Sequence, residues 1–237
     1  MDADPALQMP ARATVRSGSR RTQPIDDLVD HLTTQLLTGS QQYLIVAPPG
    51  AGKSLVCRLV FLALTSKGMK VPALVDLRGE SLERAEELVR DRDLVVMDSL
   101  DELLASGTFT QVRQAVQDTT LGRADVVACR THFYEQFLTG TPFVEGRTIL
   151  EIKAWDIPTS ERYMDAYQRH VFSNDDLSAV DELKRRLESP SVESLLSIPL
   201  RLNMALDLIP PGENNLPLEL NSLSLHRQWI EQTLRNE

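Results

Sequence analysis

Residues 47–54 of the chain read Ala47-Pro48-Pro49-Gly50-Ala51-Gly52-Lys53-Ser54. Apart from an alanine in place of the first glycine, this octapeptide fits the pattern G-x-x-x-x-G-K-[ST] of a phosphate-binding loop. Gly50 and Gly52 allow the backbone to curl so that several N–H groups converge on an anion, and the helix that follows directs its positive end at the same point. Lys53 is placed to bridge the β and γ phosphates, and the Ser54 hydroxyl is placed to bind magnesium. The stretch therefore predicts a site for a nucleoside triphosphate with magnesium.

The flanking sequence suits such a loop. An apolar strand is expected over Tyr43–Val46 and an apolar helix from Lys53 to about Ser66, so the loop connects a strand to a helix. An ordinary glycine-rich turn is the alternative, and Gly-Lys-Ser directly after an apolar strand argues against it. We expect the nucleotide to contact Pro49, Gly50, Ala51, Gly52, Lys53, Ser54 and Leu55.

A second motif follows in the stretch Asp93-Leu94-Val95-Val96-Met97-Asp98-Ser99-Leu100-Asp101-Glu102. Asp98 comes directly after four apolar residues, which places it at the carboxyl end of a buried strand, where open α/β sheets bind their ligands. We expect Asp98 to hold magnesium, directly or through water. Asp101 and Glu102 lie close enough to orient or deprotonate an attacking water, and their spacing does not choose between them. For Asp98 alone, a helix N-cap is the alternative role.

The remaining apolar runs predict the fold. Strands are expected over Ala73–Asp76, Asp125–Cys129 and Thr148–Ile152, with helices around Leu82–Val89 and Thr108–Thr119 between them. Alternating strands and helices imply a parallel sheet that is covered on both faces. We therefore predict an α/β protein with the three-layer P-loop NTPase fold, followed by a C-terminal helical subdomain.

Three segments are expected along the chain. Residues 1–24 mix Pro, Ser, Thr, Gln and Arg without apolar periodicity, which predicts a flexible N-terminal arm. Residues 25–156 are the predicted α/β domain, which opens with a helix from Ile25. The strand signals stop after Trp155, so residues 157–237 are the predicted helical subdomain, with the boundary near 155–158. Helices are expected over 159–170, 176–188, 191–207 and 222–235, with a turn-rich run over 210–215.

The two phosphate-site motifs together resemble the NACHT family within the STAND class of P-loop ATPases. The family's apolar strand, Asp, small residue, apolar residue and Asp-Glu appear here as residues 93–102, with Ser99 where many members have Gly. The segment 128–131 resembles the strand end that carries the family's sensor arginine, here Arg130. The segment 195–200 is similar to the helical-domain segment whose proline, here Pro199, packs near the adenine. The resemblance covers roughly residues 40–237.

Two of these residues have simpler alternative roles. The guanidinium of Arg130, at the end of a strand beside the phosphate site, can contact a γ phosphate and report its presence, but a surface ion pair would also explain an arginine there. Pro199 can equally be a helix break between packed helices.

The resemblance implies a nucleotide-controlled signalling ATPase with ATP or ADP and Mg²⁺ as cofactors. ADP would hold a closed state, and exchange for ATP would open the molecule for self-assembly, with slow hydrolysis and a role in innate immunity or bacterial antiphage defence. The expected partner is a second copy of the chain on activation, or a separate effector or sensor protein. The end of the chain around Leu225–Ile230 looks like the approach to a winged helix, so the chain is either a fragment or signals through such a partner.

Three other functions remain open. One is an AAA+-like ATPase motor acting on nucleic acid or protein complexes, although no arginine finger is identifiable. Another is a scaffold that binds ATP without hydrolysis, against which the acids Asp98, Asp101 and Glu102 count. The third is a small-molecule kinase, which the long helical half fits poorly. The preference for ATP over GTP rests on the resemblance, since the sequence has no N-K-x-D motif for reading guanine.

Bulk properties exclude some classes. A net charge of -9 argues against nucleic acid as the main ligand. The longest strongly apolar stretch, Leu55–Thr65, is interrupted by Arg58 and is too short to span a bilayer. The N-terminus has no apolar core of a secretory signal, so a cytoplasmic location is expected. Cys57 and Cys129 lack metal-type spacing and are expected to be small buried hydrophobes.

Overall fold

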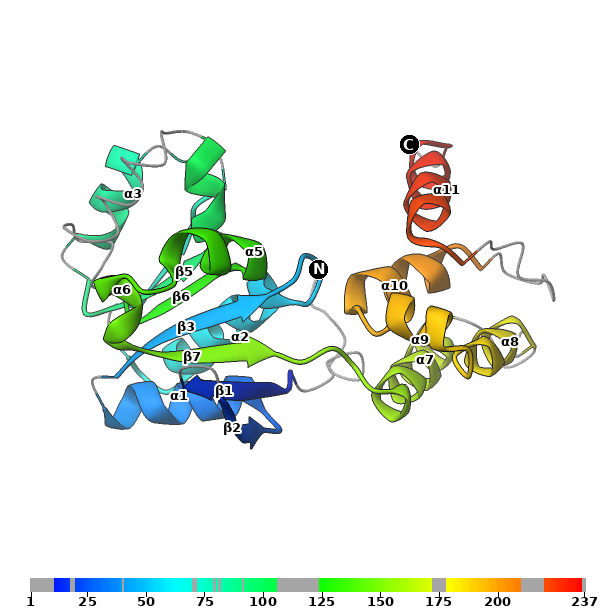
Figure 1. Ribbon diagram of the computed structural model, residues 1–237, viewed down its shortest axis with the longest axis horizontal. Coiled ribbons are helices and arrows are strands. Elements are labelled where there is room, and N and C mark those ends of the chain that lie inside the picture. The colour runs from blue at the N-terminus through cyan, green and yellow to red at the C-terminus, as the bar shows by residue number, and fades with distance from the viewer. Residues whose placement is uncertain are drawn as a thin grey trace. The chain divides into compact units, whose positions relative to one another are not determined.

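The structure of the chain is a computed structural model (Figure 1). It describes residues 11–17, 20–39, 41–69, 72–78, 80, 82–90, 92–105, 124–171, 178–209 and 220–235. The chain divides into two compact units, of which one ends at Lys153 and the other begins at Ala154. The first unit contains the sheet and the second is helical. The predicted helix over 108–119 and the predicted turn-rich run over 210–215 lie outside the described residues.

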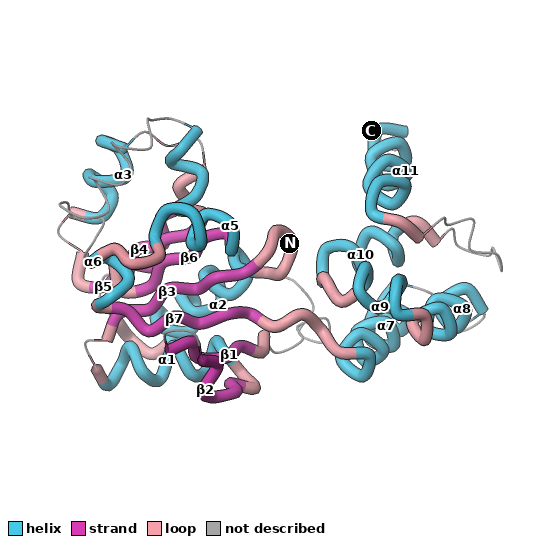
Figure 2. The backbone as a smooth tube through the Cα atoms, viewed as in Figure 1, coloured by secondary structure: helices cyan, strands magenta, loops and turns pink. Residues whose placement is uncertain are grey.

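The first unit is built on a seven-stranded sheet with the order β2-β1-β7-β3-β6-β5-β4. The strands from β7 to β4 in that order are mutually parallel, and β1 and β2 are antiparallel to their neighbours. Figure 2 shows the strands of the sheet in magenta. Their bounds are β1 Ala13–Ser17, β2 Arg20–Ile25, β3 Gln42–Ala47, β4 Pro72–Asp76, β5 Leu94–Asp98, β6 Val126–Arg130 and β7 Arg147–Ile152. One strand, β6, separates β3, which leads into the phosphate loop, from β5, which carries the acids.

Both faces of the sheet are covered, because the central strands carry apolar side chains on both faces. Every residue of β5 is buried, as expected for a strand in the middle of a parallel sheet. Alternate residues of β3 belong to different cores: Ile45 packs with helices α1 (Leu28–Thr38) and α2 (Lys53–Ser66), whereas Leu44 packs with side chains from the opposite face. That opposite face is covered by α3 (Leu82–Val89), η2 (Leu100–Ala105), α5 (Thr131–Phe133), η4 (Tyr134–Leu138) and α6 (Pro142–Glu145). The prediction of a three-layer α/β fold is confirmed.

The predicted flexible arm over 1–24 is wrong for residues 13–17 and 20–24, which form β1 and most of β2. Ala13 pairs with Ile152 of β7, and Ala13 is 1% exposed. The sequence shows little apolar periodicity here because the segment is held mainly by main-chain pairing to the edge of the sheet, which any side chain permits. The helix expected from Ile25 begins at Leu28, and its first N–H groups are capped by the carboxylate of Asp27.

The second unit consists of α7 (Ile157–Val171), α8 (Ser178–Arg186), α9 (Pro190–Leu196), α10 (Pro199–Asp207) and α11 (Ser222–Arg235). The C-terminal helical subdomain was therefore predicted correctly. The single helix expected over 191–207 was wrong, since it is divided between α9 and α10. Pro199 is the cause: it lacks an N–H for a continuing helix and holds Ile198 in an extended conformation, with φ -92° and ψ 117°.

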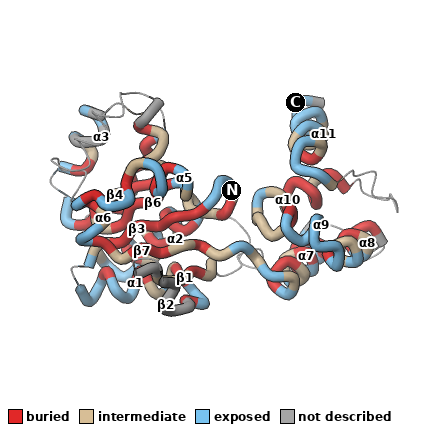
Figure 3. The backbone as a smooth tube through the Cα atoms, viewed as in Figure 1, coloured by how far each residue is buried: buried red, intermediate tan, exposed pale blue. Residues whose placement is uncertain are grey.

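A polar network ties three helices of the second unit together around its buried core (Figure 3). The carboxylate of Asp207 accepts hydrogen bonds from the Tyr167 hydroxyl of α7 (2.7 Å), the Trp229 indole of α11 (3.1 Å) and the Asn203 amide (3.1 Å). Because α7, α10 and α11 all meet at this carboxylate, their packing is specified by polar as well as apolar contacts. None of the helices in the described part of the chain is long and apolar enough to cross a membrane.

Candidate functional site

The loop between β3 and α2 has the backbone that its glycines predict. Gly50 has φ 77° and Gly52 has φ 94°, both in the left-handed region that side chains rarely adopt. Gly52 is the N-cap residue of α2 and has no side chain to occupy the free N–H groups of the first turn. Ala47, which replaces the usual first glycine, is the fully buried last residue of β3, where no special backbone is needed. The loop thus keeps an anion-binding helix start despite that substitution.

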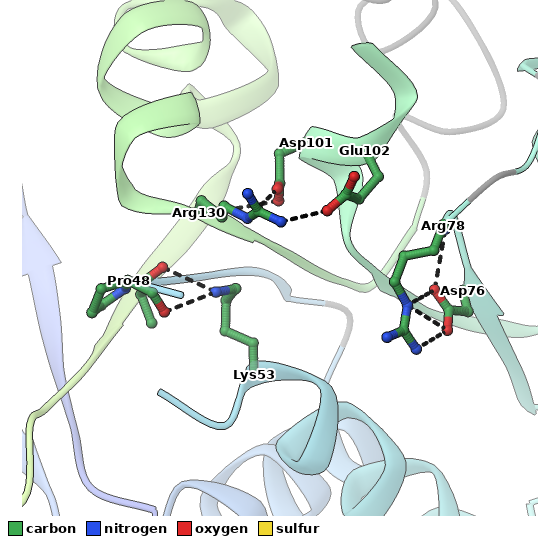
Figure 4. A network of polar contacts seen from close by, with 8 residues as sticks. Pro48, Lys53, Asp76, Arg78, Asp101, Glu102 and Arg130 are labelled. Carbon is green, nitrogen blue, oxygen red and sulfur yellow. Dashed lines mark hydrogen bonds and ion pairs between the residues drawn. The ribbon is translucent and has the colours of Figure 1, made fainter. Parts of the chain in front are cut away.

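Lys53 projects from the first turn of α2 toward the acids of the site (Figure 4). Its Nζ donates to the carbonyl oxygens of Ala47 (3.0 Å) and Pro48 (3.2 Å). Burial lowers the pKa of Lys53, and the nearby carboxylates of Asp101 and Asp98 oppose that shift. The ammonium is therefore a poorly solvated cation held close to two acids.

Asp98 ends β5 on the α1–α2 side of the sheet, two residues after the buried Val96. It is only 4% exposed, and its Oδ1 has no hydrogen-bond partner among the described residues. A buried carboxylate oxygen without a partner is costly, and a hard cation would satisfy it. No group of three or more Asp, Glu, His or Cys residues that could hold a metal occurs in the described part of the chain. The donor set fits magnesium, which keeps several water and phosphate ligands, better than a metal enclosed by protein alone.

A sharp turn sends the chain from β5 into η2. Ser99 has φ 62° and is the one non-glycine residue of the described chain with a positive φ. The Ser99 carbonyl then accepts the N–H of Glu102 (2.9 Å). Leu100 and Leu103 are buried in the core, so Asp101 and Glu102 are left on the side of η2 that faces the site. The turn therefore places both acids beyond the end of β5.

Arg130, the last residue of β6, binds both of these acids (Figure 4). Its Nε lies 2.9 Å from Asp101 Oδ2, its backbone N–H donates to Asp101 Oδ1 (3.0 Å), and its Nη2 donates to Glu102 Oε1. The side chain of Asp101 is 9% exposed, whereas those of Glu102 and Arg130 are 32% and 49% exposed. Asp101 is thus the less exposed anchor for the arginine, while the side chain of Glu102 is more open to solvent.

Comparison with known proteins supports the fold. No protein-family model matches the sequence, and no curated protein matches it. Among solved structures, the Aeropyrum pernix ORC1 protein in complex with DNA is similar with a TM-score of 0.52 and 16% identity, over 86% of this chain and 64% of that one. Domain III of the Thermotoga maritima replication initiation protein DnaA is similar with a TM-score of 0.52 and 9% identity, over 86% of this chain and 88% of that domain. The chain has the P-loop nucleoside triphosphatase fold.

In this P-loop fold, the ends of four parallel strands meet at one edge of the sheet. Ala47 of β3 pairs with Arg130 of β6, and Asp76 of β4 pairs with Asp98 of β5. The structure therefore brings together Lys53, Asp98, Asp101, Glu102 and Arg130 at the carboxyl edge, where the sequence predicted a site. Ser54 is the second residue of α2, directly after Lys53, and the side chain of Leu55 is 49% exposed on that helix. Pro199 belongs to the second unit, as the first residue of α10.

Asp76 and Arg78 are site residues that the sequence analysis missed. Arg78 Nε lies 2.9 and 3.0 Å from the two carboxylate oxygens of Asp76, and the Arg78 backbone N–H donates to Asp76 Oδ1 (3.1 Å). Arg78 lowers the pKa of Asp76, and the pKa of Arg78 is raised chiefly by Asp76 and further by Asp98 and Glu102. An acid at the end of the predicted strand 73–76 was the available signal, but its distance from Asp98 was not visible in the sequence.

Proposed function

We propose that the chain is a nucleotide-controlled ATPase, a switch of the NACHT type that binds Mg-ATP at the P-loop and hydrolyses it slowly. The observation that carries this proposal is the binding of Arg130 to both Asp101 and Glu102, at the edge of the sheet where Lys53 and Asp98 also lie. Arg130, which is expected to contact the γ phosphate, is thereby bound to Asp101 and Glu102, the acids expected to act on water. A nucleotide and these acids would compete for one guanidinium.

Each residue has a role that its surroundings support. Lys53 exchanges the carbonyls of Ala47 and Pro48 for the β and γ phosphates, because a charged acceptor binds an ammonium more strongly than a neutral one. Ser54 and Asp98 hold magnesium, for which the unpartnered Oδ1 of Asp98 is the supporting observation. Bound magnesium supplies charge neutralisation of the phosphates.

The contacts also distinguish the two acids. Arg130 binds both oxygens of Asp101, Oδ1 through a backbone hydrogen bond and Oδ2 through an ion pair, so Asp101 is a positioning residue. Glu102 makes one exchangeable contact and is more exposed, so Glu102 is the acid that orients the attacking water.

The switch follows from differential binding. ATP offers Arg130 a γ phosphate that ADP lacks, so ATP favours the state in which Arg130 leaves Glu102. When Arg130 leaves Glu102, the carboxylate of Glu102 is free to orient water, and Arg130 at the end of β6 changes its position. The resemblance to the NACHT family assigns Pro199 to the adenine, and the ATP-bound chain is expected to bind a second copy of itself or a separate partner.

The first test compares Lys53→Ala, Glu102→Gln and Asp101→Asn with the wild type, by ATP binding and by turnover. Lys53→Ala is expected to lose ATP binding, whereas Glu102→Gln keeps it and loses about 100-fold or more in turnover. Asp101→Asn is expected to lose less turnover than Glu102→Gln, because it retains an acceptor oxygen for Arg130. A wild-type protein without affinity for ATP would refute the proposal.

The second test concerns the switch itself. Arg130→Gln is expected to reduce the ratio of ATP affinity to ADP affinity by about tenfold, a typical coupling between a ligand group and a conformational change. Arg84→Gln is the matched control, because Arg84 forms an exposed ion pair with Glu87 on α3. Light scattering with ATP or ADP would then show whether assembly follows the same ratio. An unchanged ratio of ATP affinity to ADP affinity in Arg130→Gln would mean that Arg130 does not sense the γ phosphate, even if the chain is an ATPase.

A second candidate function is an ATPase motor that acts on nucleic acid. The observation in its favour is the likeness of fold to an ORC1 protein solved in complex with DNA, which extends over 86% of this chain. The net charge of -9 opposes it. Turnover measured with and without single-stranded and duplex DNA separates the two candidates, because only a motor of this kind is expected to be stimulated.

A further inference from the structure

Two carboxylates stand side by side at the carboxyl edge of the sheet. Asp76 and Asp98 are the last residues of β4 and β5, and they are paired in the parallel register. Paired residues of parallel strands project from the same face. Two residues earlier, Leu74 and Val96 pack in the core on the α1–α2 side, so both carboxylates project toward the side on which α2 begins.

The protein supplies hydrogen-bond partners to these two carboxylates differently. Asp98 is 4% exposed, and its Oδ1 lacks a hydrogen-bond partner within the described residues. Asp76 is bound at both oxygens by Arg78. Figure 4 shows the Arg78 side chain folded back onto Asp76. A buried oxygen without a partner, next to a second acid whose charge is balanced by one arginine, is an arrangement that a dication would stabilise.

We propose that Asp76 and Asp98 form the acidic wall of a divalent-cation site, in which Arg78 holds Asp76 until the metal enters. The inference rests on the proposed function and deepens it, since it assigns a second acid to the magnesium site of the ATPase. Magnesium suits this wall because it accepts carboxylate and hydroxyl oxygens and retains several waters. Two carboxylates and the Ser54 hydroxyl leave positions for phosphate oxygens, so the protein alone binds the metal weakly and binds it more tightly with a nucleotide.

Arg78 has a second part in this arrangement. A dication at the wall displaces the guanidinium from Asp76, because it brings more positive charge to the same oxygens. Arg78 then presents its planar donors to the space beside Glu102, where an arginine binds phosphate oxygens well. In the resting protein, Arg78 is therefore an internal competitor of the metal.

The experiment titrates the nucleotide-free protein with Mn²⁺, followed by the loss of the free Mn²⁺ electron paramagnetic resonance signal. The Arg78→Gln variant is expected to bind Mn²⁺ about tenfold more tightly than the wild type, the lower end of the range measured for residues beside metal ligands. Adding Asp76→Asn to that variant is expected to reverse the gain. Arg84→Gln is the matched control, because it removes an arginine from a similarly exposed ion pair on α3. Thermal unfolding of each variant verifies that it is folded.

The outcomes separate this inference from the proposed function. Equal Mn²⁺ affinity of Arg78→Gln and Arg84→Gln, or a gain that survives Asp76→Asn, would overturn the inference even if the wild type hydrolyses ATP. An Asp76-dependent gain supports the site, and a wild type that then fails to bind ATP would refute the ATPase alone. In a protein that does bind ATP, Asp76→Asn is expected to raise the Mg²⁺ concentration needed for half-maximal turnover by about tenfold.

Discussion

The two edges of the parallel sheet use charged residues in opposite ways. At the amino edge, the carboxylate of Asp125 accepts the Val95 N–H (2.8 Å), and Nη1 of Arg147 donates to the Ala124 carbonyl (2.6 Å) and the Tyr43 carbonyl (3.4 Å). At the carboxyl edge, one oxygen of the buried Asp98 has no partner in the described chain. The charged groups of the amino edge are therefore bound to the main chain of the sheet, whereas the carboxyl edge keeps one buried carboxylate oxygen that a ligand can bind.

The same contrast holds for the backbone. The strained φ of Ser99 lies at the carboxyl edge, directly after Asp98. Backbone strain gathers at binding sites because a ligand relieves it or uses it, while a purely structural edge has no reason to retain it. If this comparison is correct, equivalent substitutions at the two edges should change stability in opposite directions.

The largest expected effect is that of Arg147→Ala at the amino edge. Arg147 is 7% exposed, and its guanidinium also lies 4.2 Å above the Phe143 ring. The substitution removes a charged donor from the Ala124 and Tyr43 carbonyls and leaves Asp125 without its nearby cation, so it should lower the free energy of unfolding by about 3 kcal/mol. Urea denaturation measures this change.

Two further variants serve as controls for Arg147. Arg147→Lys keeps the charge but loses the planar donors, and a loss of about 1 to 2 kcal/mol is expected, which remains measurable if the alanine variant does not fold. Arg84→Ala removes an arginine from an exposed ion pair and should change stability by less than about 0.5 kcal/mol. An effect of Arg147→Ala no larger than that of Arg84→Ala would contradict the assignment of the amino edge to stability.

Asp98→Asn and Asp125→Asn form the matched pair that sharpens the comparison. Asn at position 98 removes a buried charge with an unpartnered oxygen, so the nucleotide-free protein should become more stable by about 1 kcal/mol. Asn at position 125 keeps an oxygen for the Val95 N–H but loses the attraction to Arg147. Because burial raises the pKa of Asp125 in spite of these contacts, relief of that burial offsets most of the loss, and the protein should be destabilised by no more than about 0.5 kcal/mol.

The thermal shift given by Mg-ATP supplies the functional half of this test. It should disappear in Asp98→Asn and persist in Asp125→Asn, because only the first residue is proposed to hold the metal. Changes of stability in the same direction at both positions would remove the distinction between the two edges.

The sequence predicted the carboxyl edge better than the amino edge, for a physical reason. A phosphate loop and an acid after an apolar run are local patterns, so the sequence predicts Lys53, Asp98 and Glu102 as candidate site residues. Arg147 is not predicted, because its partners are main-chain carbonyls of residues far away in the sequence. Main-chain acceptors carry no side-chain signature.

The pairing of strands in the sheet was the other feature that the sequence did not show. Asp76 ends a predicted strand, but its place beside Asp98 depends on β4 pairing with β5, which no local pattern indicates. The pairing of β1 with β7 was missed for the same reason. By contrast, α2 was predicted with its observed bounds, because a helix is specified by contacts within its own segment.

The smallest expected effect is that of Ser99→Gly, at a position where sequence and structure give different explanations. By sequence, Ser99 is one small residue in place of another. In the structure Ser99 has φ 62°, so the position requires a left-handed backbone, which glycine adopts without the clash of a Cβ atom. The gain is partly offset by the greater freedom of glycine in the unfolded chain, so Ser99→Gly should be more stable by about 0.5 kcal/mol.

The same substitution at Ser197, where φ is -63°, offers no such relief and should destabilise by about 0.5 to 1 kcal/mol. Paired urea denaturation curves decide the sign, and a destabilised Ser99→Gly would mean that the turn after Asp98 carries no strain for a ligand to use.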